Sequence, residues 1–402
     1  MQILNQPKRL APFEKMTKKN LKSTLFNLFT DQHLQPSYDE YLELNTALQT
    51  GDIPMDKVMA WVMTNPRQNR KLFETALYQG LDQLPEQIPV LTEFFNLVEH
   101  APSWFDASKL ETAIQLTHRL GSNGTYIMRD LSLMTGYQYP GFNQPLIITG
   151  ALKKYAGKRL AETHKWWLDV TQLNSFNRFN TGFTSTVYVR FIHALVRFQL
   201  NKSSEWDRDV WGEPINQYDQ AMTNLAFCSV LLLGVRAIGI FPSKAESDAL
   251  MHFWKYAGWL MGVDEKWLVD KESEAWKLLQ WMDYAHPKMD ESSRALALSL
   301  SNEPFERHYK YFNALQQKQA YQNHLDITQL FIGRKKMKNL GLKPRTFAWF
   351  PLYLMAKNTV LYNGAKHIGK LDQYLQKQGR AEQEYSLELY QNAGKQLASM
   401  HQ

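Results

Sequence analysis

The sequence predicts an all-α protein, and three observations support that fold class. Apolar residues recur at spacings of three and four along the 402-residue chain, the pattern of one face of a helix. Glycine is scarce, at 20 residues, and the Gly-, Asn- and Asp-rich turns that separate short strands in a sandwich or barrel are few. Helix start signals led by Ser recur along the chain. We therefore expect one large helical domain with extra N- and C-terminal helices.

The first predicted element is a basic N-terminal arm, residues 1–35. Its first 22 residues carry one acid, Glu14, and six basic residues: Lys8, Arg9, Lys15, Lys18, Lys19 and Lys22. The whole chain has a formal charge of +7, so much of the excess lies in this arm. We expect a solvated tail; contact with a membrane surface or nucleic acid is the alternative. Elsewhere no basic patch interleaved with aromatic residues resembles an RNA-binding or helix-turn-helix signature, so no nucleic-acid partner is predicted.

Residues 36–402 form the predicted helical domain, and three capping boxes mark helix starts within it. In each box a Ser side chain and a Glu three residues later accept each other's backbone N–H groups. The three boxes are Ser37 with Glu40, Ser108 with Glu111, and Ser243 with Glu246. Breaks between helices are expected where Gly, Pro and Asn gather, at 121–124, 136–145, 201–214 and 239–243.

Three of the predicted helices differ in how apolar they are. In residues 160–170 one face carries Leu160, Thr163, Trp167 and Val170. Residues 187–200 are apolar nearly all round, which indicates a helix buried in the centre of the fold. Residues 371–400 are polar with widely spaced Leu and Tyr, which is typical of a long surface helix.

No predicted element is a membrane span. The longest apolar run, residues 225–235, is well short of the roughly 20 residues that a spanning helix needs, so a core helix is expected there. A second stretch, residues 346–355, is short and contains Pro351. The N-terminal residues lack the apolar stretch of an export signal. We expect a soluble, cytoplasmic protein for which peripheral membrane contact is not excluded.

The usual catalytic and metal-binding motifs are missing from the sequence. One cysteine, Cys228, rules out a disulfide framework and thiolate metal clusters within the chain. The chain contains no GxSxG, GxxxxGK[ST], GxGxxG or HExxH motif. It also contains no Glu-x-x-His pair, the signature of di-iron helical bundles. Any metal or cofactor chemistry must therefore use other ligands.

His193 differs from the other ten histidines, most of which have charged or polar neighbours. It lies in the continuously apolar helix at 187–200, where its strongly polar companions are Arg190 and Arg197. At about 100° per residue these three side chains fall within an arc of roughly 60°. Two arginines are costly to bury without anionic partners. Either protein carboxylates neutralise them in a structural arrangement, or a cofactor such as haem places its propionates there.

A second polar group lies upstream on the predicted helix at 160–170. Arg159, Glu162 and Thr163 occupy adjacent positions on one side of that helix, at spacings of three and four. An Arg–Glu pair at this spacing is ordinarily a surface salt bridge. In a cofactor pocket the same residues would instead present a carboxylate and a hydroxyl to a substrate or to bound oxygen.

These two segments together resemble a known family. Arg159 and Thr163 form Arg-x-x-x-Thr, and thirty residues later comes the His of Arg-x-x-His-x-x-x-Arg, from Arg190, His193 and Arg197. This pattern resembles the family of latex clearing proteins, which are rubber oxygenases, and MpaB-type oxygenases. Further matching stretches lie at 214–217, 219, 223–227 and 233–239. The resemblance covers roughly residues 110–300.

The resemblance implies an all-helical protein with a globin-like core around haem b. The family's proximal iron ligand falls on His193, its arginines fall on Arg190 and Arg197, and a distal threonine falls on Thr163. Thr223, in a matching stretch, is assigned as a further cofactor contact. Latex clearing proteins use the haem and dioxygen to cleave a carbon–carbon double bond of polyisoprene.

The sequence departs from the rubber oxygenases on the distal side. Glu162 stands where they have a lysine before the threonine. They also use a glutamate upstream of the arginine, whereas residues 131–161 contain no Asp or Glu. Glu162 is therefore assigned as acid or base, beside Arg159 and Thr163.

We therefore predict a haem b-dependent oxygenase or peroxidase-like oxidoreductase. Its substrate would be a hydrophobic, isoprenoid-like molecule smaller than rubber, with dioxygen or peroxide as co-substrate. Two alternatives remain open: a non-catalytic haem protein that senses, stores or carries its ligand, and a helical scaffold without a cofactor.

Overall fold

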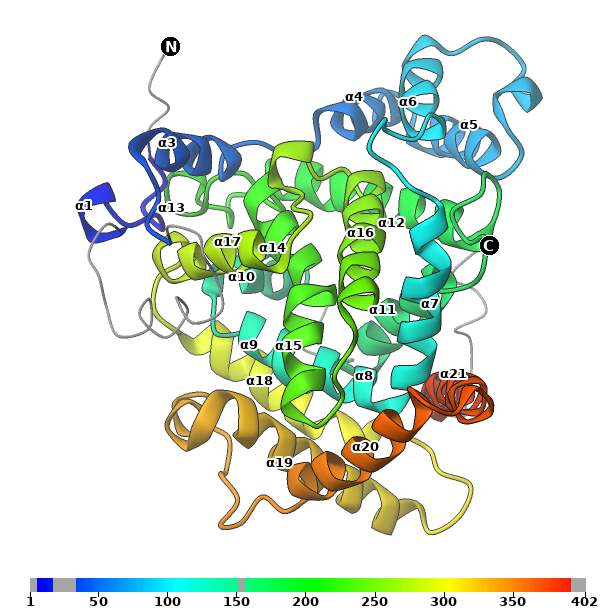
Figure 1. Ribbon diagram of the computed structural model, residues 1–402. Helices are drawn as coiled ribbons and strands as arrows, with labels where there is room; N and C mark the ends of the chain where they lie inside the picture. The colour runs from blue at the N-terminus through cyan, green and yellow to red at the C-terminus, as the bar shows by residue number, and fades with distance from the viewer. Residues whose placement is uncertain (1–5, 17–33, 151–155, 392–402) are drawn as a thin grey trace. The chain divides into compact units, whose positions relative to one another are not determined.

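A computed structural model describes residues 6–16, 34–150 and 156–391 (Figure 1). Within these ranges the secondary structure is helical and no β-strand occurs. The predicted all-α fold class is confirmed. The described residues fall into two compact units, and each unit is made of three separate stretches of the sequence. Unit 1 comprises residues 1–110, 169–225 and 251–287, and unit 2 comprises residues 111–168, 226–250 and 288–402.

Unit 1 is built from short and medium helices. It contains α1 (Phe13–Met16), α3 (Tyr38–Ala47), α4 (Ile53–Val62), α5 (Pro66–Tyr78), η1 (Leu81–Gln83), α6 (Pro89–Glu99), α12 (Thr181–Leu200), α13 (Arg208–Trp211), most of α14 (Gln217–Phe227), η3 (Glu265–Trp267) and α17 (Glu272–Ala285). The C-terminal part of α16 (Lys244–Leu260) also belongs to it.

Unit 2 contains the longer C-terminal helices. Its elements are most of α7 (Ser108–Leu120), α8 (Ser122–Tyr126), the π-helix η2 (Ile127–Leu133), α9 (Met134–Gly136), α10 (Pro140–Ile148), most of α11 (Ala156–Val170), α15 (Ser229–Ala237), α18 (Glu291–Asn302), η4 (Glu303–Glu306), α19 (Asn313–Asn339), α20 (Phe350–Ala365) and α21 (Gly369–Gln391).

Two of the three predicted capping boxes are confirmed. At the start of α3 the Ser37 N–H donates to Glu40 at 2.8 Å, and the Glu40 N–H donates to Ser37 Oγ at 3.2 Å. Ser243 and Glu246 make the same exchange, at 2.7 and 3.2 Å.

The third predicted box, at Ser108, is wrong. Ser108 is the first residue of α7, and both its N–H and its hydroxyl donate to the Asp106 carboxylate, at 3.0 and 2.6 Å. A carboxylate is a stronger acceptor than a hydroxyl. Asp106, two residues upstream, therefore takes the place that the sequence pattern assigned to the Ser–Glu pair.

The predicted breaks at 121–124 and 136–145 are shorter than expected. Only Gly121, with φ of 51°, interrupts the chain before α8 begins. The second break covers 137–139, and Pro140 then starts α10. Proline is tolerated in the first turn of a helix because its missing N–H would have had no intrahelical partner.

The N-terminal arm is not solvated at Arg9. This side chain is buried in unit 1, where its guanidinium donates to both oxygens of Asp219 at 2.8 Å and to the Ala285 carbonyl at 2.7 Å. Burial next to a carboxylate outweighs hydration of the charge when both donors are used. Lys18, Lys19 and Lys22, also assigned to the arm, lie outside the described residues.

Aromatic side chains form much of the core of unit 1. Phe73 of α5 stacks on Phe191 of α12 with ring centroids 4.5 Å apart, and Phe95 of α6 lies 6.0 Å from Phe73. Arg178 closes one end of this group. Its guanidinium donates to the carbonyls of Ala76 and Leu77 at the C-terminus of α5, where helix carbonyls lack intrahelical partners.

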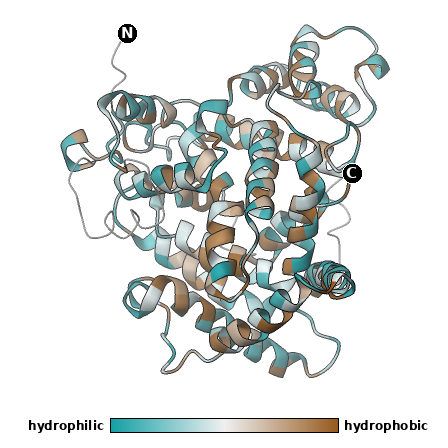
Figure 2. Cartoon of the chain, viewed as in Figure 1, coloured by the Kyte–Doolittle hydropathy of each residue, from teal (hydrophilic) through white to brown (hydrophobic). Residues whose placement is uncertain are grey.

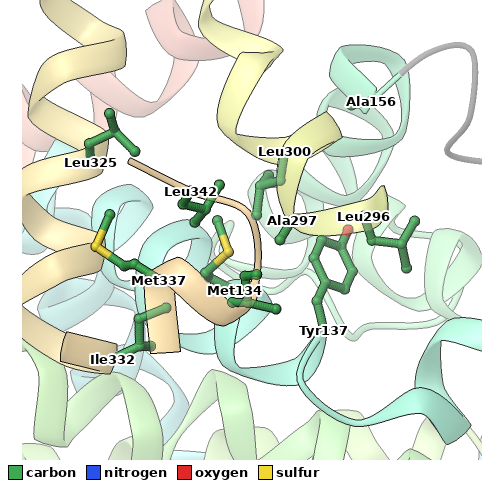
Figure 3. Close-up of a cluster of buried hydrophobic side chains, with 11 residues drawn as sticks. Met134, Tyr137, Ala156, Leu296, Ala297, Leu300, Leu325, Ile332, Met337 and Leu342 are labelled. Carbon is green, nitrogen blue, oxygen red and sulfur yellow. The ribbon is translucent and has the colours of Figure 1, made fainter. Parts of the chain in front are cut away.

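Unit 2 has an aliphatic core, shown in Figure 3. Buried side chains from α9, α18 and α19 meet there: Met134, Leu296, Ala297, Leu300, Leu325, Ile332 and Met337. Tyr137 lies at one side of this cluster. In α15, a Cβ on Gly234 would lie 2.3 Å from the side chain of Ile127. Only glycine therefore lets α15 approach η2 this closely.

α14 and α15 include the longest apolar run, and Figure 2 shows α15 as largely hydrophobic. By length and composition alone, Gln217–Ala237 could cross a membrane, although 56% of its apolar window is buried. The backbone breaks at Cys228, with φ −119° and ψ −83°, so the stretch consists of two helices. Its first turn contains Asp219, the ion-pair partner of Arg9. The cytoplasmic location stays a prediction.

The predicted C-terminal helix is confirmed as α21 up to residue 391, and residues 392–402 lie outside the described ranges. α21 also has a buried side. Gln383 is fully buried and donates to the Thr117 carbonyl of α7 at 2.8 Å.

Candidate functional site

α12 carries His193 and two buried arginines within unit 1. Most of the helix is covered by protein, including Phe191 and Ala194. His193 lies in a half-buried stripe with Val189, Ile192 and Val196, and Tyr188, Leu195 and Phe198 outside this stripe are half-buried too. At about 100° per residue the four positions of the stripe span roughly 100° of the helix circumference. The predicted buried helix at 187–200 is therefore confirmed, although part of its surface stays accessible.

Arg190 is neutralised by a carboxylate of the protein. Its Nε and Nη2 donate to the two oxygens of Asp52 at 2.6 and 2.8 Å, and Nη1 donates to the Leu260 carbonyl at 3.1 Å. Asp52 also accepts the Met55 N–H at 3.3 Å as the N-cap of α4. A Cβ on Gly262, which has φ of 93°, would lie 2.3 Å from Asp52. The Arg190–Asp52 ion pair is therefore buried, with side chains 4% and 2% exposed.

Arg197, two turns further on, has its own partner one turn into α4. Its Nε donates to Asp56 Oδ1 at 2.9 Å, and Nη1 donates to the Ile215 carbonyl at 2.9 Å. Burial raises the pKa of Asp56 to about 6, and the charge of Arg197 offsets part of that rise. At neutral pH the carboxylate is ionised and the pair is intact.

These ion pairs give Arg190 and Arg197 partners within the protein, and their assignment as cofactor contacts stays a prediction. Both guanidinium groups are committed to Asp52 and Asp56 on α4 and to backbone carbonyls. A propionate would have to displace a carboxylate that is already bound with good geometry. Of the two interpretations that the sequence left open for the arginines, the structure supports neutralisation by protein carboxylates.

His193 itself fits the role of a single cofactor ligand. Its imidazole is half-buried, and the aliphatic side chains beside it, Val189, Ile192 and Val196, are also incompletely covered. Haem needs one imidazole on iron and apolar walls around the macrocycle. Among the described residues no cluster of three or more His, Cys, Asp or Glu side chains could hold a bare metal ion.

Thr223 lies on α14, also in unit 1. Its side chain is exposed, and its hydroxyl donates to the Asp219 carbonyl one turn earlier at 2.8 Å. Burial opposes ionisation of the Asp219 carboxyl, but Arg9 and His286 hold its pKa well below the ordinary value. The Arg9 ion pair therefore anchors the helix that presents Thr223.

The predicted distal residues lie on α11, in the part of that helix that belongs to unit 2. Arg159 Nη1 donates to Glu162 Oε2 at 2.8 Å, and the Arg159 side chain is 43% exposed. Thr163 is exposed, on the same face of α11 as half-buried Leu160 and buried Trp167. The structure brings Arg159 and Glu162 together as the sequence spacing predicts. Their roles in catalysis stay a prediction.

Next to Glu162 and Thr163, His164 anchors α11. Its Nε2 donates to the Gln383 carbonyl of α21 at 2.7 Å. Burial lowers the pKa of His164 to about 4, and the hydrogen bond offsets only part of this effect. The ring is therefore neutral at pH 7.

A buried charge network in unit 2 was not anticipated from the sequence. The π-helix η2 turns Arg129 and Asp130 inward, and His324 lies 2.6 Å from Asp130. Glu303 accepts from Arg129 at 3.0 Å and from Arg307 at 2.7 Å. Burial raises the pKa of Asp130 to about 7. The same burial opposes ionisation of Glu303, but the two arginines outweigh it and keep its pKa low.

Asp52 and Asp56 are the residues that sequence reasoning missed at the α12 site. They pair with arginines 138 and 141 residues away. A signal was present in the sequence. Asp56 is the acid within the mostly apolar stretch 53–62, and Asp52, one helical turn earlier, is the N-cap of that helix. Nothing in the local sequence says which arginines they meet.

With this geometry established, comparison with known proteins decides the family. A family model described as "ER-bound oxygenase mpaB/B'/Rubber oxygenase, catalytic domain" matches residues 119–358. The chain belongs to this family. The motifs predicted a resemblance over roughly residues 110–300. The matched residues continue past the C-terminal end of that stretch, to residue 358, and they include α11, α12 and α14.

Two relatives of the rubber oxygenase family show how far the likeness reaches. The "Rubber oxygenase" of Streptomyces sp. (strain K30) is 24% identical over 190 residues, which is 46% of this chain and 46% of that enzyme. The alignment thus spans about half of that relative. The structure of a latex clearing protein in the closed state superposes with a TM-score of 0.63 at 17% identity, covering 88% of this chain and 94% of that chain. The fold is therefore that of latex clearing protein, and the predicted membership of an oxygenase family is confirmed.

Proposed function

We propose that this protein is a haem b-dependent oxygenase in which His193 holds the iron. The substrate in this proposal is a hydrophobic, isoprenoid-like molecule, with dioxygen or peroxide as co-substrate. The observation that carries the proposal is the position of His193. It is a half-buried imidazole with aliphatic neighbours on a largely buried helix, inside the segment that matches the oxygenase family.

α12 is suited to position such a ligand. Arg190 lies three residues before His193 and Arg197 four residues after it, and each is tied to α4 by an ion pair. A side chain between two such anchors needs little reorganisation when it binds. In this proposal the arginines orient the ligand helix, and they do not bind the cofactor.

Bound haem would supply the oxygen chemistry, and the protein would supply the ligand, apolar walls and proton handling. Val189, Ile192 and Val196 would exclude water beside His193. On α11, Glu162 would hold or release a proton at Oε1 or Oε2 while Arg159 fixes its orientation at 2.8 Å. The Thr163 hydroxyl, which is exposed, would donate a hydrogen bond to the co-substrate or to solvent.

The substrate class rests on the family and on the chemistry of the α12 stripe. Three aliphatic side chains beside the imidazole favour an apolar molecule over a charged one. The named relatives are rubber oxygenases, and rubber is an isoprenoid polymer. A small isoprenoid alkene is therefore the first substrate to test.

Haem titration tests the proposal directly. Purified full-length protein is mixed with haem, and the Soret band is followed for wild type and His193→Ala. We expect a band in wild type that is lost or shifted in the variant, while the far-ultraviolet circular dichroism is unchanged. A wild-type protein that gives no specific Soret band, or a variant with an unaltered one, would contradict the proposal.

A second measurement separates an oxygenase from a haem carrier. The haem-loaded protein is incubated with an isoprenoid alkene and dioxygen or peroxide, and carbonyl products are quantified. Glu162→Gln should lower the rate while leaving the Soret band in place. Haem binding without any turnover would support the non-catalytic alternative.

A further inference from the structure

Residues 327–371 of unit 2 combine a high positive charge with an exposed apolar surface. This segment contains nine Lys and Arg residues and no Asp or Glu, whereas the whole 402-residue chain has a net charge of +7. The excess charge of the protein is therefore concentrated here more than in the N-terminal arm.

α20, which lies in this segment, is apolar on two sides. Its inner side buries Phe350, Leu354 and Tyr362 against unit 2. The opposite side presents an apolar stripe at spacings of three and four: Trp349, Leu352, Tyr353, Ala356 and Val360. Leu352 is 53% exposed and Val360 is 74% exposed. A contiguous exposed apolar stripe of this kind marks an interaction site.

From the sequence alone, Pro351 is expected to interrupt the short apolar stretch at residues 346–355. The structure places it in the first turn of α20, which continues for another fourteen residues to Ala365. A proline in the first turn does not interrupt a helix. A helix of 16 residues extends about 24 Å, long enough to lie along a surface.

Exposed basic side chains lie before, within and after α20 along the sequence. Lys343 precedes the helix, Lys357 lies within it, and Lys366 and Lys370 follow it, all of them exposed. Arg345 is excluded from this group because it pairs with Asp326 at 2.9 Å. Long lysine side chains can reach outward past buried apolar residues and keep their charge in water.

We propose that the exposed face of α20 is a docking surface for an anionic lipid bilayer. Its aliphatic residues would enter the interface, with Trp349 and Tyr353 at the headgroup level, where such rings are favoured. The flanking lysines would meet acidic headgroups. A second copy of this chain is disfavoured as the occupant because it would bring the same positive charge to the contact.

This surface is independent of the haem proposal and would serve a hydrophobic substrate dissolved in a membrane. Each lysine near an anionic surface strengthens binding about fivefold. Binding should therefore depend on acidic lipid and weaken as salt is added.

The test is co-sedimentation of the full-length protein with vesicles, without added haem. One set of vesicles is phosphatidylcholine alone, and the other contains phosphatidylglycerol as well. We expect at least tenfold tighter binding to the acidic vesicles. Lys343→Glu, Lys357→Glu and Lys366→Glu combined should abolish this preference, and Leu352→Ser with Val360→Ser should weaken binding at least fivefold.

Matched controls carry equal changes outside the segment. Lys71→Glu, Lys288→Glu and Lys318→Glu make the same charge change at exposed positions. Ile53→Ser with Leu173→Ser removes apolar side chains that are each 61% exposed. Both controls should bind within twofold of wild type, and unchanged melting curves confirm that all variants are folded.

Three results would overturn the proposal. One is a wild-type protein that does not prefer acidic vesicles. Another is loss of binding in the controls equal to that in the α20 variants. The third is a protein dimer in vesicle-free solution, detected by light scattering, that Leu352→Ser with Val360→Ser separates, since that result assigns the surface to self-association.

Discussion

α12 and α11 carry the two groups of charged residues that the sequence placed beside a cofactor, and they are held in opposite ways. On α12, Arg190 and Arg197 are buried and tied to Asp52 and Asp56 of α4. On α11, the Arg159–Glu162 pair is only partly buried, with side chains 43% and 18% exposed, and the helix is anchored by His164, whose neutral ring donates to a backbone carbonyl.

The difference shows that an Arg-rich motif does not by itself identify a cofactor contact. A buried guanidinium must be neutralised, and α4 does this for both arginines of α12. A partly exposed pair such as Arg159–Glu162 is screened by solvent and adds less stability. α12 is therefore suited to hold a ligand in one orientation, and α11 is suited to present groups that exchange protons or bind substrate.

The largest effect is expected at Asp52. The Asp52 and Arg190 side chains are 2% and 4% exposed, so Asp52→Ala leaves a buried charge without its partner. We expect the free energy of unfolding to fall by about 3–5 kcal/mol. Urea denaturation monitored by circular dichroism measures it.

A double variant distinguishes a lost ion pair from a lost helix cap at this position. Asp52→Asn retains a capping side chain, and Arg190→Met removes the charge while keeping an unbranched apolar chain. The combination should recover much of the stability lost in Asp52→Asn alone. Additive losses, or a loss below about 1 kcal/mol for Asp52→Ala, would show that the pair does not hold α12.

The next effect is the pH dependence of the α11 anchor. The pKa of His164 is lowered from 6.5 to about 4 in the folded protein. The unfolded chain therefore takes up a proton first, so this contribution to stability is complete above pH 6.5 and is lost as the pH falls to about 4. The full shift corresponds to about 3 kcal/mol, and about 2 kcal/mol is expected because the ring is only half-buried.

His164→Gln isolates that contribution, because a Gln amide can still donate to the Gln383 carbonyl but does not titrate. The free energy of unfolding is measured at several pH values between 4 and 7 for both proteins. The wild type should lose more stability than the variant on acidification. Parallel curves would mean that the ring is solvated in the folded state.

The smallest effect is expected at Arg159. Its own side chain is 43% exposed and solvent screens its pair with Glu162, so Arg159→Ala should change the free energy of unfolding by only about 0.3 kcal/mol. If the residue orients Glu162 for catalysis, turnover by the haem-loaded enzyme should nevertheless fall. A loss of more than about 1 kcal/mol would mean that the pair is structural, as on α12.

Local patterns accounted for much of the fold. The spacing of apolar residues predicted α12 as a buried helix and α21 as the C-terminal helix, and two Ser–Glu pairs predicted the starts of α3 and α16. The π-helix η2 was not predicted, because it is read from backbone hydrogen bonds and its apolar spacing is close to that of an α-helix. Proline was misread twice, at Pro140 and Pro351, because it starts a helix as readily as it ends one.

The sequence by itself determined the helical class, the family motifs and the position of His193 on a buried helix, because helix periodicity and motif spacing are local properties. Only the tertiary structure decided which groups neutralise Arg190 and Arg197, and which side of α20 is left exposed. Ion pairing and burial depend on segments more than a hundred residues apart, such as α4 and α12. No spacing rule along the chain encodes which of these segments meet.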